Sequence, residues 1–192
     1  MVILVIIGIV PSFIVKNVVV NSYETRAVSI REVNLKNQCD ILGNQLMKEN
    51  YLREPDSDVI NGELSMLSAI YNGRILIINK DAKIIKDTYD IDVGKYALSE
   101  EVIQCFEGKS TANYDDKNAY IEMTSPITKM DSNTIEGVML VSISTSEIED
   151  SIDMLENRGN LLLSIICILV VVFGYLLAGV LVKPFSRVTK AI

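Results

Sequence analysis

Histidine and tryptophan are absent from this chain of 192 residues, and cysteine occurs only three times. Without histidine there can be no Ser-His or Cys-His pair for nucleophilic catalysis and no histidine ligand for zinc. The sequence also contains no glycine-rich phosphate-binding loop of the usual kinds. We therefore expect no enzyme active site and no cofactor within this chain.

The few cysteines and the paired acids do not indicate a metal site. Cys39 and Cys105 are far apart in the sequence and cannot form a zinc site by themselves. They could pair with each other, but nothing else suggests a disulfide scaffold, so we expect small buried apolar side chains. Acid pairs such as Asp115-Asp116 lack the spacing of a calcium loop, and we expect solvated turns there.

Basic residues are outnumbered, and the formal net charge is −7. Every Asp and Glu lies between residues 21 and 160, so this middle segment is strongly acidic. Nucleic-acid binding needs a basic surface, so we expect no nucleic-acid partner.

Two apolar runs occupy the ends of the chain. Residues 161–182 carry no charge, and a membrane-crossing helix needs roughly 20 apolar residues. Residues 1–20 carry one charge, Lys16, which can extend toward lipid headgroups, and Pro11 would kink this helix without abolishing it. A cleaved signal peptide would need a basic leader and a cleavage pattern, so we expect an uncleaved transmembrane helix at residues 1–20 and a second at 161–182.

The charges beside the second run predict its orientation. Residues 183–192 contain Lys183, Arg187 and Lys190 and no acid. Positive charge next to a span marks the cytoplasmic side. We therefore expect a two-pass protein of the cytoplasmic membrane, with both termini inside and residues 21–160 outside.

A long helix is predicted over residues 22–50, directly after the first run, because no Gly or Pro occurs between Pro11 and Gly43. One side of this helix carries a heptad-like seam of five residues: Val28, Leu35, Cys39, Leu42 and Leu46. We expect part of the seam to contact a second copy of the chain in a parallel homodimer. The alternative is that the seam packs on the sheet of its own domain.

The pattern then changes repeatedly between helix and strand. A second helix begins after a cap at Asp56, Ser57 or Asp58 and ends at Asn72-Gly73, where Gly73 would take the left-handed conformation. A short helix follows Ser99, and a last helix starts near residue 147 and runs into the second span, with Gly159 as its one weak point. Strands are predicted at residues 74–79, 84–89, 110–114, 119–128 and 135–144.

Most consecutive strands have no helix between them, which excludes a parallel sheet. The predicted fold class is therefore α+β, with a five-stranded antiparallel sheet and a long N-terminal helix, between two transmembrane helices.

Four passages of this arrangement are similar to a known family: Asn21-Ser22-Tyr23-Glu24, Gly73 to Asn79, Asp87-Thr88-Tyr89, and Gly137 to Ser144. Together with the element order, they resemble the extracytoplasmic PAS-like sensor domains, the Cache or PDC group, of bacterial sensor histidine kinases. Residues 183–192 resemble the start of a HAMP domain, because Pro184, Val188 and Ile192 recur at four-residue steps.

The resemblance implies the sensing and transmembrane-signalling part of a two-component histidine kinase in a bacterial membrane. Its kinase would follow Ile192, since this chain has no phospho-accepting histidine, and would act on a cytoplasmic response regulator. Three alternatives remain open: a chemoreceptor, a cyclic-dinucleotide enzyme, or a two-pass envelope-binding protein without catalytic output.

The resemblance also implies where a stimulus would bind. In PAS-like sensors small molecules bind against the sheet, although a protein stimulus is also possible. The corresponding candidates here are Arg74, Asp87, Tyr89, Tyr114, Tyr120 and Glu122. The simpler interpretation is that tyrosines such as Tyr89 and Tyr120 only cover the edge of the sheet.

Overall fold

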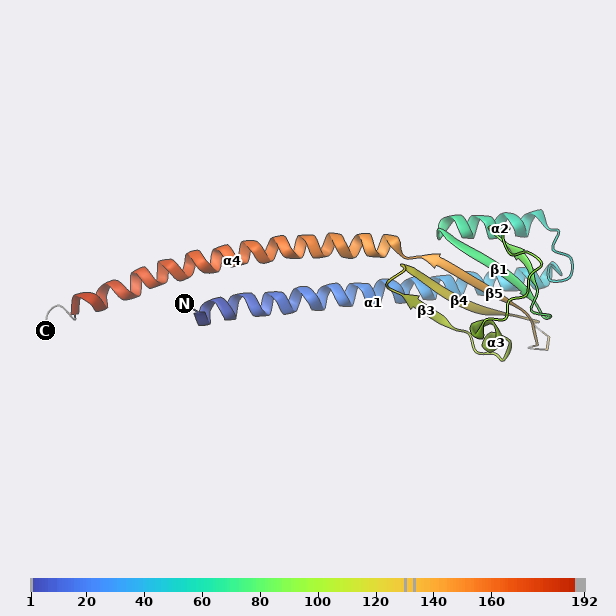
Figure 1. The fold of residues 1–192 in the computed structure, drawn as a ribbon, viewed down its shortest axis with the longest axis horizontal. Coiled ribbons are helices and arrows are strands. Elements are labelled where there is room, and N and C mark those ends of the chain that lie inside the picture. Colours follow the sequence, from blue (N-terminus) through green and yellow to red (C-terminus); the bar gives the residue numbers. More distant parts are fainter. Residues whose placement is uncertain (1, 130, 133, 189–192) are drawn as a thin grey trace. The chain divides into compact units, whose positions relative to one another are not determined.

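The computed structural model describes residues 2–129, 131–132 and 134–188 (Figure 1). Residues Ala27–Glu149 form one compact unit, here called the sheet unit. The described residues before Ala27 and after Glu149 form a second compact unit, here called the helical unit. Each unit is described by itself below.

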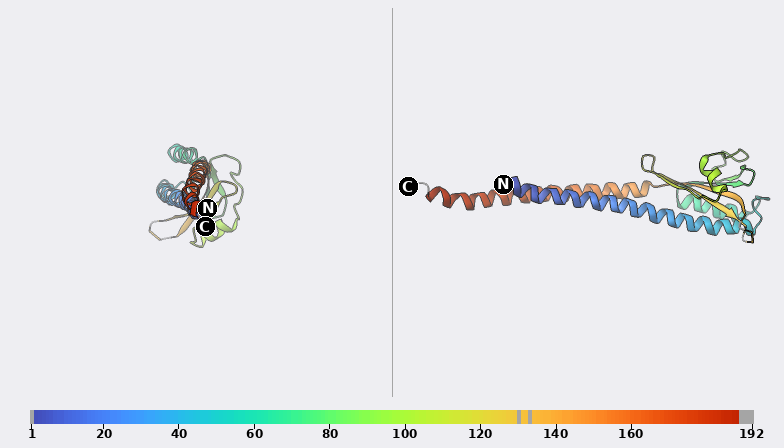
Figure 2. Two further views of the ribbon diagram at one scale, coloured as in Figure 1. Left: turned by 90° about the vertical axis from the view of Figure 1, so that its left-hand side faces the viewer. Right: turned by 90° about the horizontal axis from the view of Figure 1, so that it is seen from below.

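Four helices are present in the described chain: α1 (Val2–Lys48), α2 (Asp58–Ile70), α3 (Glu100–Phe106) and α4 (Ser146–Val188). The right-hand view of Figure 2 shows α1 and α4 as continuous ribbons. Of the three predicted caps of α2, Ser57 is the one used: its side chain accepts a hydrogen bond from the backbone N–H of Ile60 at 3.4 Å. Gly159 does not interrupt α4.

The five strands are β1 (Gly73–Asn79), β2 (Ile84–Asp87), β3 (Ala112–Asp115), β4 (Tyr120–Thr128) and β5 (Ile135–Ser144). They form one antiparallel sheet in the order β2-β1-β5-β4-β3, so β2 and β3 are its edges. The prediction of an α+β fold with a five-stranded antiparallel sheet and a long N-terminal helix is confirmed. Strand β2 ends two residues earlier than predicted.

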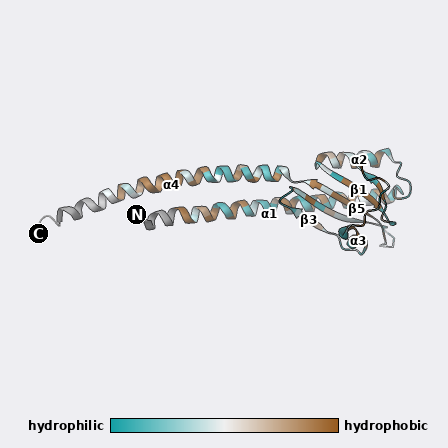
Figure 3. Ribbon diagram, viewed as in Figure 1, coloured by the Kyte–Doolittle hydropathy of each residue, from teal (hydrophilic) through white to brown (hydrophobic). Residues whose placement is uncertain are grey.

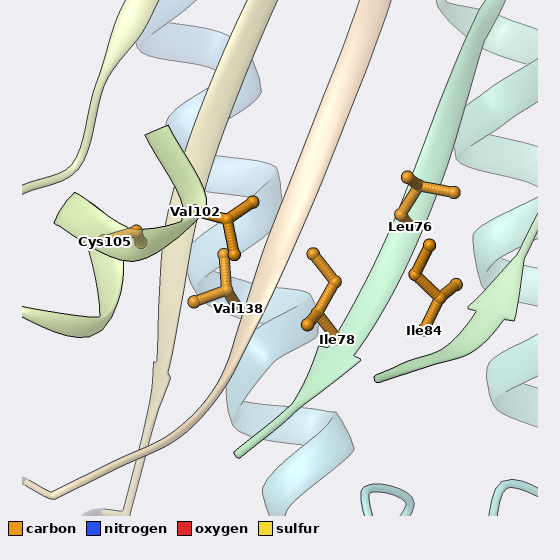
Figure 4. Close-up of a cluster of buried hydrophobic side chains, with 6 residues drawn as sticks. All are labelled: Leu76, Ile78, Ile84, Val102, Cys105 and Val138. Carbon is orange, nitrogen blue, oxygen red and sulfur yellow. The ribbon is translucent and has the colours of Figure 1, made fainter. Parts of the chain in front are cut away.

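Side chains alternate between the two faces of the sheet, as the pleat of a strand requires. On one face, Leu76 and Ile78 of β1 join Val138 of β5 in a buried cluster with α3 residues such as Val102 (Figure 4). We call this the α3 face. On the opposite face, Ile75 of β1 and its neighbours are equally buried: Ile77, Ile121, Met123, Met139, Val141 and Ile143.

The five predicted seam residues of α1, from Val28 to Leu46, are all buried within the single chain, with 0 to 7% of each exposed. Figure 4 shows the segment of α1 behind the sheet, on the side opposite α3. The expectation that this seam contacts a second copy is therefore corrected: Val28, Leu35, Cys39, Leu42 and Leu46 belong to the core of the sheet unit. The physical reason is that the apolar face opposite α3 must be covered, and α1 covers it.

The end of α2 also differs from the prediction. Asn72, not Gly73, takes the left-handed conformation, with φ of 45°. Gly73 starts β1, and a Cβ added there would stand 2.5 Å from the backbone oxygen of Ser142 on β5. Glycine at this position serves the close approach of two strands rather than a helix stop.

Helix α4 contains a stretch, Ser146–Leu177, that is long and apolar enough to cross a membrane by length and composition. Within the described residues it is the one such stretch found, and Figure 3 shows its apolar part in brown. The first span predicted at residues 1–20 includes residues 1–8, whose side chains lie outside the described part, so the two-pass topology stays a prediction. Residues 189–192 of the HAMP prediction also lie outside it.

Cys39 and Cys105 are free and buried. The expectation of small buried apolar side chains is confirmed for both. Burial, with the negative charge of Asp40, raises the pKa of the Cys39 thiol to about 12.

Candidate ligand-binding site

The carboxylate of Asp87, at the end of β2, is completely buried and accepts five hydrogen bonds. Two come from Arg74 on β1, from Nε to Oδ1 at 3.0 Å and from Nη2 to Oδ2 at 2.6 Å. Three come from the backbone N–H groups of Tyr89, Ile91 and Asp92, each at 2.9 Å. Asp87 thereby holds the loop that follows β2, which explains why the strand stops there.

Arg74 also donates from Nη2 to Oδ2 of Asp92 at 2.6 Å, so one guanidinium joins two carboxylates. Burial of Asp87 opposes its ionisation, but the hydrogen bonds from Arg74 and from the loop N–H groups outweigh burial and hold the pKa of this carboxyl well below its usual range. Two of the predicted ligand contacts, Arg74 and Asp87, are therefore engaged with each other and with the loop.

A row of polar residues crosses the sheet from β1 to β3. Arg74 lies opposite Ser142, Ser142 opposite Glu122, and Glu122 opposite Asn113. Directly paired residues share one face of a sheet, and Arg74 is two residues from Leu76 of the α3 cluster. The row therefore lies on the α3 face, where the Ser142 hydroxyl donates to Oε2 of Glu122 at 3.2 Å.

At the β3 end of this row the sheet unit has an open cavity of about 460 Å³. Residues of α3, β3, β4 and the turn between the two strands line it: Glu101, Asn113, Tyr114, Asp115, Asp116, Lys117, Tyr120 and Glu122. A volume of this size is in the range of small-molecule sites. Its polar lining contrasts with the apolar cluster under α3.

The turn between β3 and β4 is built around Asp115. Its Oδ1 accepts from the N–H groups of Lys117 and Asn118 at 2.9 and 3.1 Å, and its Oδ2 accepts from Nδ2 of Asn118 at 2.8 Å. The hydrogen bonds from Asn118 contribute most to lowering the pKa of the Asp115 carboxyl. Asp115 thus sets the shape of one wall of the cavity.

The cavity is electrostatically negative. The charge of Asp115, partial desolvation and the charges of Glu122 and Glu101 raise the pKa of the Tyr120 hydroxyl. Four carboxylates line the cavity and Lys117 is the one cation among its described lining residues. Such a site favours a ligand that carries positive charge, and the two tyrosine rings can add cation–π attraction.

The structure brings together three of the six predicted contacts, Tyr114, Tyr120 and Glu122, around this cavity. Arg74 and Asp87 form the loop network instead, and Tyr89 is 51% exposed and does not line the cavity. Sequence reasoning did not name the other five lining residues as ligand contacts: Glu101, Asn113, Asp115, Asp116 and Lys117. The only sequence signal for Asn113 was its alternation with Asp115 on one short strand.

No group of three or more Asp, Glu or Cys side chains is arranged to hold a metal ion in the part of the chain that the structure describes.

Comparison with known proteins gives structural similarity only. No protein-family model matches the chain, and no curated protein matches it. The fold is similar to the sensor domain of the histidine kinase DctB of V. cholerae, with 14% identity and a TM-score of 0.46, over 70% of this chain and 59% of that one. It is also similar to the sensory domain of the Campylobacter jejuni chemoreceptor Tlp3, with 13% identity and a TM-score of 0.47, over 68% and 60% of the two chains.

A third similar structure is a domain of a sensory box/GGDEF family protein from Vibrio parahaemolyticus, with 12% identity and a TM-score of 0.41, over 65% and 57% of the chains. The present chain thus spans about three fifths of the length of these structures. The similar structures come from receptors with different outputs. At such low TM-scores they assign no function to this chain, and its own strand order defines the fold.

Proposed function

We propose that this chain is the sensory and membrane-crossing part of a two-component sensor histidine kinase, and that a small molecule bound at the cavity is its stimulus. One observation carries the proposal. Strand β5, which holds Ser142 of the polar row, is joined to α4 by the single residue Thr145, and α4 continues without a break through its apolar stretch. A shift of β5 would therefore act on the first turn of α4 through a single residue.

The ligand class follows from the cavity. Four carboxylates and two tyrosines around about 460 Å³ suit a small organic molecule with one or more ammonium groups. Glu122 sits where the polar row meets the cavity, and Ser142 on β5 donates to it. An ammonium group bound by Glu122 would compete with Ser142 for the carboxylate and so act directly on β5.

Relay to a cytoplasmic kinase requires two conformations whose balance the ligand changes. Helix α4 is the physical connection, because a hydrogen-bonded helix transmits a displacement or rotation along its axis. The kinase itself would lie beyond Ile192, and determining the reading frame past that residue tests this part. A histidine-bearing helix followed by an ATP-binding domain supports the proposal, whereas a long methyl-accepting coiled coil would replace it with a chemoreceptor.

The ligand proposal is tested by titrating the purified chain in micelles with putrescine, lysine and arginine, using succinate as the anionic comparison. We expect at least one of the three amines to raise the unfolding temperature and succinate to leave it unchanged. Glu122→Gln should weaken amine binding by about tenfold or more, the scale of one lost charged hydrogen bond. Glu54→Gln, on an exposed residue far along the chain, is the matched control. Equal binding by both variants contradicts the assigned role of Glu122.

The relay is tested in the full-length receptor with Ser151→Pro, which breaks the helix just after α4 begins. Ser151→Ala is its control. We expect the proline variant to bind amine normally but to lose the change in kinase autophosphorylation, while the alanine variant keeps it. A proline variant that still responds would rule out transmission through a rigid α4.

A further inference from the structure

The helical unit contains a second cavity of about 460 Å³, between the first part of α1 and α4, which we call the interhelical groove. Its walls are mostly apolar and include Val15 and Val19 of α1 and Leu155, Leu162 and Ile166 of α4. The groove is separate from the polar cavity of the sheet unit and shares no residue with it.

A close contact between Lys16 and Gly159 shapes this groove. A Cβ added to Gly159 would stand 2.9 Å from Cγ of Lys16, so the absence of a side chain on α4 makes room for the lysine stem. The ammonium of Lys16 then donates to Oδ1 of Asn160 at 2.8 Å. Gly159, the weak point in the sequence pattern, is therefore a contact site, and Lys16 is held in place at the level of residues 159–160.

The charged residues that line the groove are all positive. Lys16 and Arg158 line it, and no Asp or Glu is among its described lining residues. The bond from Lys16 goes to a neutral amide, which leaves its charge uncompensated. Within the described chain neither cation is ion-paired with a carboxylate. An apolar environment makes such uncompensated positive charge a strong attractant for an anion.

The two cations stand at one end of the apolar segment. In the sequence, Arg158 and Lys16 are the charged residues next to the uncharged stretches 161–182 and 1–15. In a membrane this is the depth at which hydrocarbon gives way to headgroups, where lysine and arginine meet lipid phosphates. The groove therefore presents two positive charges at headgroup level and an apolar wall that continues toward Ile166.

We propose that the interhelical groove binds an anionic glycerophospholipid, with its phosphate between Lys16 and Arg158 and an acyl chain along Val15, Leu162 and Ile166. A zwitterionic lipid fits the apolar wall equally well but brings a cation of its own to the two basic residues. The charge complementarity thus selects an anionic headgroup. The proposal rests on the membrane insertion assumed in the proposed function, and it is independent of the ligand bound by the sheet unit.

The test uses the full chain in nanodiscs made of equal parts phosphatidylglycerol and phosphatidylcholine. The protein is extracted in mild detergent, and the lipid that stays bound is quantified by mass spectrometry. We expect phosphatidylglycerol to be retained over phosphatidylcholine. The double variant Lys16→Gln/Arg158→Gln should lower that preference by about tenfold or more, because each cation near a membrane surface contributes to binding of anionic lipid.

Two control variants and one variant of the apolar wall test whether the result is specific to the groove. Arg26→Gln/Lys48→Gln removes the same charge from positions that do not line the groove and should retain the wild-type preference. Lys16→Arg keeps the charge and should also retain it. Leu162→Trp should lower retention of phosphatidylglycerol by filling the apolar wall while both cations remain. Circular dichroism confirms that each variant keeps its helices.

Equal retention of the two lipids by the wild-type chain would overturn the proposal, as would an unchanged preference in the Lys16→Gln/Arg158→Gln variant. Recovery of neither lipid by the wild-type chain would also overturn it, because the proposal requires phosphatidylglycerol to stay bound. A chain that prefers phosphatidylglycerol but binds no amine would instead refute the sensing proposal and leave the groove assignment standing.

Discussion

The guanidinium of Arg74 and the carboxylate of Asp87 form a two-point hydrogen-bonded pair between β1 and β2, and the carboxylate is completely buried. We expect Asp87→Ala to lower the free energy of unfolding by about 3–5 kcal/mol, because it leaves three loop N–H groups without their acceptor and takes from Arg74 the buried one of its two carboxylate partners. Asp90→Asn, at an exposed carboxylate in the same loop, should change it by less than about 0.5 kcal/mol. Urea unfolding followed by circular dichroism measures both, and similar values for the two variants would contradict this role of Asp87.

The same carboxylate predicts how stability depends on pH. Because hydrogen bonds hold the pKa of folded Asp87 below that of the unfolded chain, the unfolded state binds the extra proton as the pH falls. The contribution is therefore fully present above about pH 4, near the unfolded pKa of an aspartate, and is lost progressively below it. We expect the slope of unfolding free energy against pH between about 2 and 4 to be shallower in Asp87→Asn than in the wild type. Parallel curves would show that other carboxylates dominate acid unfolding.

Substitution by alanine should have opposite effects on stability at Gly73 and at Gly43. A methyl group at Gly73 would stand 2.5 Å from Ser142 O and 2.7 Å from Cγ2 of Ile143, so Gly73→Ala must push β1 and β5 apart. Gly43→Ala meets no atom within 4 Å and lies inside α1, where alanine is favoured by about 1 kcal/mol. Thermal unfolding of the full chain in micelles should show a lower midpoint for Gly73→Ala and a raised one for Gly43→Ala. A neutral Gly73→Ala would mean that the strands separate at little cost.

Leu35 and Ile41 distinguish the buried and exposed sides of α1. Leu35 is fully buried, whereas Ile41 is 56% exposed. We expect Leu35→Ala to cost about 2–5 kcal/mol of stability through the lost contacts and the cavity left behind. Ile41→Ala should cost less than about 0.5 kcal/mol in the monomer. Denaturant unfolding at several protein concentrations measures both. If the loss of unfolding free energy in Leu35→Ala disappeared on dilution, the seam would be a contact between copies after all.

Much of the fold could be predicted because its signals are local. The alternation of residues 119–128, the cap at one of residues 56–58 and the uninterrupted pattern of α1 each depend on neighbouring residues only, and each matches the structure. The seam was misassigned for a physical reason. A coiled coil between two copies repeats every 3.5 residues, and a helix packed on a sheet repeats every 3.6 residues. Over the few turns from Val28 to Leu46 both periods place the same residues on one side of the helix, so the sequence does not distinguish them.

The candidate site was only half predicted, because its geometry depends on strand register and on where α3 packs. Glu122 faces Asn113 on β3 and Ser142 on β5 only in the observed register, which the sequence does not specify. Arg74 and Asp87 were recognised as polar groups on the correct strands. Their mutual pairing depends on how β1 and β2 align, so it could not be distinguished from two free ligand contacts.

The strand order also determines how copies of the protein behave when crowded in a membrane. The outermost strands, β2 and β3, are four residues long each, while the inner β4 and β5 have nine and ten. Such short edges expose few unpaired backbone groups, and Lys86 and Asp115 add charge to them. A strand from a neighbouring molecule could form few backbone hydrogen bonds with these edges. The sheet therefore resists edge-to-edge aggregation even at high surface density.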